Sequence, residues 1–257
     1  MEMKHRQKHV SLRCSNQGFT MIELLVAMVV SLLALAAIYS TFLAQHRSYQ
    51  VQEETSEMQQ NIRTAMYYMQ REIRMAGSDP YNTGNFGITA AGRNSITFTE
   101  DIAGPPVGAL ALPEPDGKVN DPSIVPNIPN EDITYALNVT NLERTDNSLN
   151  NGLGVTQVVA QNIDWIDFVY LDGASPPNII PFAGTSVPAA NLGQIQSVEI
   201  TIVARTNDPL LYGTTNNNTY WNQREGMPGA ASWSPPVPDN VSRRRLTTMI
   251  HCRNLGL

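Results

Sequence analysis

The sequence predicts an α+β protein in which one long N-terminal α-helix packs on an antiparallel β-sheet. Two observations carry this prediction. Residues 19–76 contain neither glycine nor proline, and the chain after residue 77 alternates between short β-like runs and loops rich in glycine, proline and asparagine. A stretch without helix breakers favours one continuous helix, whereas alternating apolar and polar residues favour half-buried strands. With 257 residues, of which 42% are hydrophobic, the chain can build a sizeable core.

Residues 1–18 form a short basic leader ahead of the helix. The leader carries a net charge of about +3 and the remainder about −9, so the charge is unevenly distributed. A mildly acidic body without a stripe of cations argues against a nucleic-acid surface, and we expect no nucleic-acid partner. A basic segment next to an apolar helix tends to stay on the cytoplasmic side of a membrane. The charged leader residues are Glu2, Lys4, Arg6, Lys8 and Arg13.

Residues 19–44 should form the membrane-spanning half of the helix. Between Phe19 and Leu43 the only charge is Glu23. At 1.5 Å per residue this stretch spans about 37 Å, more than the bilayer core of about 30 Å. A secretory signal peptide has a shorter apolar region that ends in a small-residue cleavage site. Here the helical pattern continues, which indicates a single membrane-spanning helix with the leader in the cytoplasm.

Residues 45–76 should form an amphipathic second half, so that the whole helix runs for about 58 residues. Its apolar residues recur at spacings of three, four or seven, which places them on one face. Gly77, Asp79 and Pro80 then end the helix. The predicted packing face consists of Val51, Met58, Ile62, Ala65, Met69, Ile73 and Ala76.

Residues 77–257 should form a β-rich domain outside the cytoplasm. Two segments rich in proline, glycine or asparagine, residues 103–129 and 207–240, are predicted to be surface insertions. The expected strands cover residues 95–99, 133–139, 163–171 and 195–204, with a last strand within 246–253.

Residues with chemical reactivity are scarce. The sequence has no zinc-protease, serine-hydrolase, phosphate-loop or paired-cysteine motif. We therefore expect no enzyme, no catalytic residue, no metal site and no cofactor. If the leader is removed, Cys14 leaves with it, and Cys252 is expected to be a small structural residue in the last strand. The histidines are scattered at His5, His9, His46 and His251.

Glu23 has two alternative roles. A carboxylate inside an apolar segment costs about 2.5 to 3.5 kcal/mol at mid-bilayer, and less near an end. Thr20 and Glu23 have the spacing of a capping box, and an acid in the first turn suits the helix dipole. Alternatively, the carboxylate neutralises an amine at the start of its own helix or of a neighbouring helix. The spacing alone does not decide between these roles.

The segment Gly18-Phe19-Thr20-Met21-Ile22-Glu23, basic before and apolar after, resembles the prepilin processing signal of type IV pilins and type II secretion pseudopilins. The resemblance implies a type IV pilin-like fold, cleavage between Gly18 and Phe19 by a prepilin peptidase, and N-methylation of Phe19. It also favours the assembly role of Glu23, with the new α-amine of Phe19 as its partner. A glycine at the cut suits this chemistry because it has no side chain to obstruct the peptidase.

Downstream runs narrow the resemblance to the minor pilins of the PilW family. These runs lie at residues 67–77, 133–145, 158–173 and 243–255. The resemblance implies a low-abundance, tip-associated subunit that takes part in the initiation of type IV pili. Two alternatives stay open: a J-type pseudopilin of type II secretion, and an adhesin-like tip module suggested by the two insertions.

The resemblance also implies partners and a location. The expected partners are other minor pilins, the major pilin, the prepilin peptidase and methyltransferase, the inner-membrane assembly platform and membrane lipid. The chain is expected to start as a single-pass inner-membrane protein with a periplasmic domain. It would then move to the pilus at the cell surface.

Overall fold

The computed structural model describes residues 18–102, 115–119, 130–149, 153–207, 209 and 216–255. The chain divides into two compact units, Met1–Gln50 and Val51–Leu257. Most of the predicted insertion at residues 103–129 lies outside the described residues.

The long helix is confirmed as α1, Met21–Ile73, although it is shorter than predicted. Phe19 and Thr20 precede it, and it stops three residues before Ala76. The backbone forms a tighter, 3₁₀-type turn there, because the Met75 amide donates to the Glu72 carbonyl three residues earlier, at 2.9 Å. Gly77 follows with φ +78°, a conformation that favours glycine, and a Cβ at this position would clash with the side chain of Leu255. The helix end is therefore set by both the backbone and tertiary packing.

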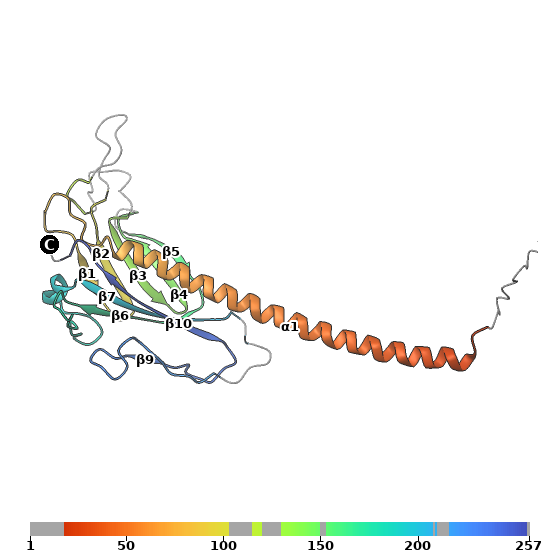
Figure 1. Ribbon diagram of the computed structural model, residues 1–257. Helices are drawn as coiled ribbons and strands as arrows, with labels where there is room; N and C mark the ends of the chain where they lie inside the picture. The colour runs from red at the N-terminus through yellow and green to blue at the C-terminus, as the bar shows by residue number, and fades with distance from the viewer. Residues whose placement is uncertain are drawn as a thin grey trace, which may run out of the picture. The chain divides into compact units, whose positions relative to one another are not determined.

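The domain contains a five-stranded and a three-stranded antiparallel sheet (Figure 1). The larger sheet has the order β1-β2-β3-β4-β5 and the smaller one β10-β7-β6, and a two-stranded ribbon pairs β8 with β9. The strands are β1 Ile88–Ala91, β2 Ser95–Thr99, β3 Asp132–Asn138, β4 Asn141–Asp146, β5 Val155–Ala160, β6 Ile163–Leu171, β7 Ser197–Arg205, β8 Tyr220–Trp221, β9 Ser232–Trp233 and β10 Arg243–His251, and a 3₁₀ helix η2 covers Ala189–Gln194.

Four of the strands lie at or close to their predicted bounds. β2 and β6 match their predicted bounds, β3 is displaced by one residue, and β7 starts two residues late. The last strand begins at Arg243, three residues earlier than expected, so that its arginines are part of the sheet. β1, β4, β5, β8 and β9 were not predicted. Two of the buried positions in β4 are the charged residues Arg144 and Asp146. The sequence of β4 therefore lacks the alternation of apolar and polar residues that usually identifies a strand.

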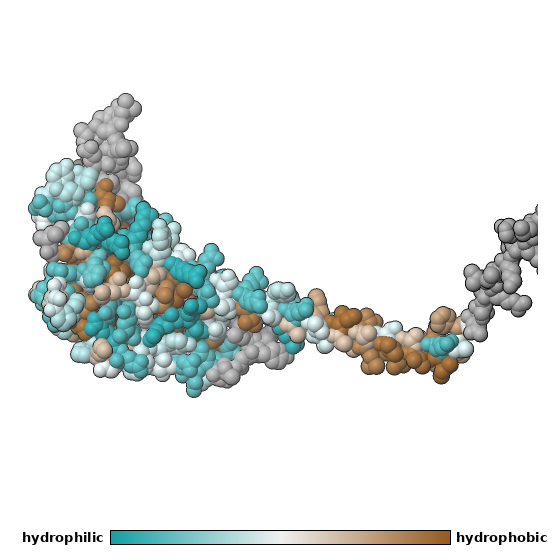
Figure 2. Space-filling model, in the orientation of Figure 1, coloured by the Kyte–Doolittle hydropathy of each residue, from teal (hydrophilic) through white to brown (hydrophobic). Residues whose placement is uncertain are grey.

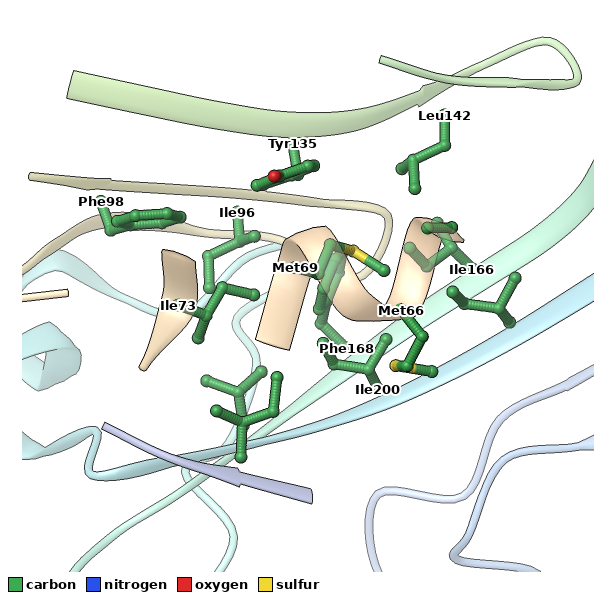
Figure 3. Close-up of a cluster of buried hydrophobic side chains, with 14 of the residues drawn as sticks. Met66, Met69, Ile73, Ile96, Phe98, Tyr135, Leu142, Ile166, Phe168 and Ile200 are labelled. Atoms are coloured by element: carbon green, nitrogen blue, oxygen red, sulfur yellow. The ribbon is translucent and has the colours of Figure 1, made fainter. Parts of the chain in front are cut away.

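The core forms where the second half of α1 meets both larger sheets. Figure 3 shows Met66 and Met69 of the helix between Tyr135 of β3 on one side and Phe168 of β6 on the other. Val51 does not share this burial, because its side chain is 40% exposed, and its predicted place on the packing face is wrong. The buried helix-side residues are Met58, Ile62, Ala65, Met66, Met69, Ile73 and Ala76.

Candidate processing and assembly site

The predicted cleavage site lies directly before the first turn of α1. The Phe19 side chain is 89% exposed. A Cβ added to Gly18 would meet no atom within 4 Å, and Gly18 does not have a positive φ. The fold itself therefore does not need glycine at position 18, and a requirement for glycine there would come from a molecule that binds this segment.

Thr20 and Glu23 form a complete capping box. The Thr20 amide and hydroxyl both donate to Glu23 Oε2 at 2.9 Å, and the Glu23 amide donates to Thr20 Oγ1 at 3.3 Å. These bonds satisfy backbone amides that would otherwise have no hydrogen-bond partner within the helix. Both bonds to the carboxylate use Oε2, and among the described residues no hydrogen bond reaches Oε1. The capping role is thus observed, and one oxygen is left for a second donor.

The first half of α1 presents apolar side chains all round the helix. Figure 2 shows this part as mostly hydrophobic, and none of its most apolar stretch is buried. By length and composition this is a helix that can cross a membrane, a property it shares with some signal sequences. Ser31 and Thr41 donate their hydroxyls to backbone carbonyls of the helix, at 2.7 and 3.0 Å, so these groups are satisfied without water. The helix surface is therefore suited to lipid or to other apolar helices.

In the domain, Glu72 of α1 joins the helix to the larger sheet. It accepts a hydrogen bond from Tyr135 Oη at 2.6 Å and an ion-paired bond from Arg144 Nε at 2.9 Å. Arg144 also donates to Asn130 Oδ1 at 2.6 Å. Burial, with the neighbouring Glu72 carboxylate, raises the pKa of Tyr135 well above its usual value. Tyr135 therefore acts as a fixed donor that holds the helix in register with β3.

Beside this network lies a groove of about 760 Å³ at the end of α1. Its walls include Tyr67, Met75 and Ile102, and the Glu100 carboxyl lies among them. Burial, and then the nearby Glu72 carboxylate, raise the pKa of Glu100 to about 7. Glu100 Oε2 is buried and has no hydrogen-bond partner among the described residues, so the charged form is poorly stabilised.

Among the described residues, one separate acidic cluster has the geometry to hold a cation. Carboxylate oxygens of Asp101, Asp116 and Glu131 lie within 4.8 Å of one another. However, the two Asp101 oxygens already accept hydrogen bonds from the amides of Asp116 and Gly117, at 3.1 and 2.9 Å. Acidic groups of this kind also occur without an ion, so the cluster by itself assigns no metal.

One serine and one histidine lie close enough to resemble part of a catalytic triad. Ser197 Oγ is 2.6 Å from His251 Nδ1, and Asp172 lines the same small cavity of about 210 Å³. The two residues are opposite each other on β7 and β10, and Ser197 is buried. Asp172 accepts its hydrogen bonds from Ala174 and Asn178 within its own turn. The pair is therefore arranged as a cross-strand contact, without the oriented acid that a triad requires.

Cys252 follows the last strand directly and is buried. Burial raises the pKa of its thiol to about 12, so it is a poor nucleophile at neutral pH. The structural role expected for this cysteine agrees with this environment.

Sequence reasoning missed the charged residues that hold the domain together. Arg243 of β10 donates to Asp164 at 2.6 Å and to both Asp239 oxygens at 2.6 and 2.7 Å. Arg224 of the long insertion donates to both Glu199 oxygens at 2.7 and 2.8 Å. Charged residues at inward strand positions were the available signal; Asp239 is only four residues from Arg243, whereas Asp164 and Glu199 are distant in the chain from the arginines that they pair with.

The comparisons with known proteins concern the N-terminus and the fold. Residues 13–39 match the prokaryotic N-terminal methylation motif. Among solved structures, the chain is similar to a type IV-like pilin from Thermus thermophilus, with 11% sequence identity, a TM-score of 0.42, and coverage of 80% of this chain and 98% of that chain. No sequence among the curated proteins matches this chain. The chain therefore carries a prokaryotic N-terminal methylation motif, followed by one long helix with an apolar first half and by antiparallel sheets.

Proposed function

We propose that this chain is a minor pilin of the PilW type, which enters type IV pili at low copy number and takes part in starting their assembly. The observation that carries the proposal is the N-terminal combination of a methylation motif and a helix with apolar side chains exposed on every side. Such a helix needs lipid before assembly and other helices after it, because water would solvate it poorly. The domain would be periplasmic first and later displayed at the cell surface.

The first step is cleavage between Gly18 and Phe19, followed by methylation of the new Phe19 amine. The free space around Gly18 supports a role in peptidase access, since the fold tolerates a larger residue there. We expect Gly18→Ala to leave the folded domain unchanged and to slow cleavage, which intact-mass measurement of the membrane protein would detect. Gly193→Ala is a matched control, because a Cβ at Gly193 also meets no atom within 4 Å. A wild-type chain that still begins at Met1 in a peptidase-competent host would contradict the proposal.

Glu23 is proposed to accept the Phe19 amine of a neighbouring subunit through Oε1 while Oε2 keeps the capping box. Glu23→Gln separates the two roles, because glutamine can still cap the helix but carries no charge. Both Glu23→Gln and Glu23→Ala should insert and be cleaved normally yet enter sheared filaments poorly. If Glu23→Gln enters filaments at the wild-type level while Glu23→Ala does not, Glu23 acts as a cap and the charge pair is wrong.

The initiator role is tested by stoichiometry. Its support is the resemblance to the PilW family and a domain whose long insertions would be difficult to pack at every position of a filament. Deletion of the gene should strongly reduce surface filaments, while quantitative mass spectrometry of wild-type filaments should find this chain far below the major pilin. A deletion that keeps normal filaments and stops protein secretion would instead favour the J-type pseudopilin. Finding the chain as the most abundant filament protein would overturn the minor role.

A further inference from the structure

The outward face of the second half of α1 carries a stripe of side chains with the spacing of a helix-pairing face. Its members follow one another at alternate steps of four and three residues, the heptad spacing by which one helix packs along another. At about 100° per residue they lie on the side of α1 opposite the buried face, and all but the half-buried Thr64 are exposed. This outer stripe consists of Glu53, Glu57, Gln60, Thr64, Tyr67, Arg71 and Arg74.

The charges of the outer stripe are separated by sign. Its start carries two carboxylates, Glu53 and Glu57, and its end carries two guanidinium groups, Arg71 and Arg74. Tyr67 lies between them and is 61% exposed. Within the described part of the chain, none of the four charged side chains takes part in a hydrogen bond or an ion pair. Each end of the stripe is therefore open to a partner of opposite charge.

The helix by itself accounts for only part of this charge order. Glu53 and Glu57 are four residues apart, so like charges lie side by side, and Arg71 and Arg74 repeat this three residues apart. Such pairs destabilise a helix. The helix dipole favours Arg71 in the last turn, but the effect is confined to that turn, and the two glutamates precede Ile73 by about four to six turns. Opposite charges laid against each end would relieve the repulsion within the stripe.

A second copy of the outer stripe supplies these opposite charges in one arrangement. The two helices must be parallel, because both membrane-spanning halves insert in the same direction. At equal height, carboxylates would oppose carboxylates and arginines would oppose arginines, which is unfavourable. When one copy is raised by 14 residues, which is two heptads, the heptad positions still match and its Glu57 lies beside Arg71 of the lower copy. This displacement is about 21 Å along the helix axis.

We propose that the outer stripe pairs two parallel copies of this chain that are displaced along α1 by about two heptads. The inference rests on the proposed assembly into filaments, because copies at equal depth in the membrane repel each other until one is drawn outward. It does not rest on the copy number, since two copies are still few beside the major pilin. Exposed ion pairs contribute little each, so the apolar first halves supply most of the contact and the charges select the displacement.

The test is cysteine cross-linking between two differently tagged full-length copies in cells that assemble filaments. Both copies carry Cys14→Ser and Cys252→Ala. One copy carries Gln60→Cys and the other Met75→Cys, because displacement by two heptads places Gln60 of the upper copy opposite Arg74, next to the exposed Met75. A short bis-maleimide should join these two copies in sheared filaments. Two copies that both carry Gln60→Cys should give little product, since their thiols would be about 21 Å apart.

Charge reversal shows whether the stripe selects the partner. Arg71→Glu with Arg74→Glu in the copy that carries the thiol at position 75 should lower the yield of the 60–75 product about fivefold. Adding Glu53→Arg with Glu57→Arg to the copy that carries the thiol at position 60 should restore the yield, because opposite charges then face each other again. Tryptophan fluorescence during urea unfolding checks that the reversed chains stay folded.

Two controls separate the stripe from charge in general and from contact in the membrane. Arg244→Glu with Arg253→Glu reverses two exposed arginines outside the outer stripe and should leave the yield unchanged. In cells without the inner-membrane assembly platform, no copy is drawn outward, and the 60–75 product should be absent. Labelling with a monofunctional maleimide checks that every thiol is accessible.

The outcomes distinguish this pairing from the proposed function. A wild-type chain that is absent from sheared filaments would overturn the proposed function itself. A chain that enters filaments without a 60–75 product from accessible thiols, or a lost yield that the reversed glutamates do not restore, would overturn the pairing alone and leave the stripe to another filament subunit. An equal yield without the assembly platform would overturn the dependence on displacement.

Discussion

The two halves of α1 share one backbone conformation and have opposite surfaces. In the first half, apolar residues occupy every face and remain exposed, whereas in the second half one apolar face is buried against the sheets and the remaining faces are largely polar. A helix that meets water on one side needs only one apolar face, but a helix surrounded by lipid or other helices needs apolar residues on all sides. An exposed side chain in the first half is therefore suited to lipid or to other helices, whereas an exposed side chain in the second half meets water. Five changes would break or sharpen this difference.

The largest effect is expected from truncating a buried methionine in the second half. Met69→Ala should lower the free energy of unfolding of the domain by about 4 kcal/mol, because it leaves a cavity between both sheets. Met28→Ala is the matched control, since Met28 is exposed in the first half of the same helix. Tryptophan fluorescence during urea unfolding measures both, because all three tryptophans lie in the domain. An equal loss in Met28→Ala would contradict the division between the halves.

An introduced charge should have a large effect in the first half of α1 and a small one in the second half, which is the reverse of the methionine truncations. Leu32→Arg places a cation in the apolar half and should raise the free energy of membrane insertion by about 3 kcal/mol. Tyr67→Arg is the control in the second half, where the exposed fraction is almost the same, 61% against 63% for Leu32. Carbonate extraction of membranes should release more Leu32→Arg than wild-type protein and no more Tyr67→Arg. Equal extraction of both variants would show that the first half does not span the bilayer.

The third change removes the ion pair between the second half and the larger sheet. Arg144→Ala leaves the Glu72 carboxylate with one donor, Tyr135, and should cost about 2 to 3 kcal/mol of domain stability. Arg71→Ala removes an exposed arginine next to Glu72 and should change the stability by less than about 0.5 kcal/mol. Urea unfolding separates the two variants, and similar losses would show that the buried pair contributes little.

The fourth change concerns the pH dependence of the domain. The pKa of Glu100 is about 7 in the folded chain, above its usual value, because of burial and then Glu72, while Arg144 and Arg71 act in the opposite direction. A raised acid pKa means that the folded state holds the proton more tightly, so this stabilisation is full below about pH 4.5 and is lost as the pH rises to about 7. Glu100→Gln should therefore unfold like wild type at pH 4 and be up to about 3 kcal/mol more stable at pH 8. An equal difference at both pH values would contradict the role of Glu100.

The smallest effect is expected at the border between the halves. Val51 has the helical spacing of the packing face but remains 40% exposed. Val51→Ala should change the unfolding free energy by less than about 0.5 kcal/mol, whereas Ile62→Ala, at the second buried position after Val51, should cost about 3 kcal/mol. A loss above 1 kcal/mol for Val51→Ala would mean that packing begins earlier in the helix than the structure indicates.

Local patterns predicted much of the fold. α1 could be located because residues 19–76 contain no glycine or proline, β2 because its apolar residues alternate, and β6 because it is a short, mostly apolar run. β4 could not, since Arg144 points inward only because Glu72 and Asn130, from other parts of the chain, accept its hydrogen bonds. The Thr20–Glu23 cap was predictable because both partners lie in one helical turn.

The sequence by itself determined the long helix, its apolar first half, most of the packing face of its second half, the capping box at Glu23 and the resemblance to prepilins. Each depends on residues that are near one another in the chain. Only the tertiary structure decided that Glu72 pairs with Arg144 and Tyr135, and that the carboxyl group of Glu100 is buried. These properties depend on contacts between distant segments, and burial and strand pairing are set when those segments pack together.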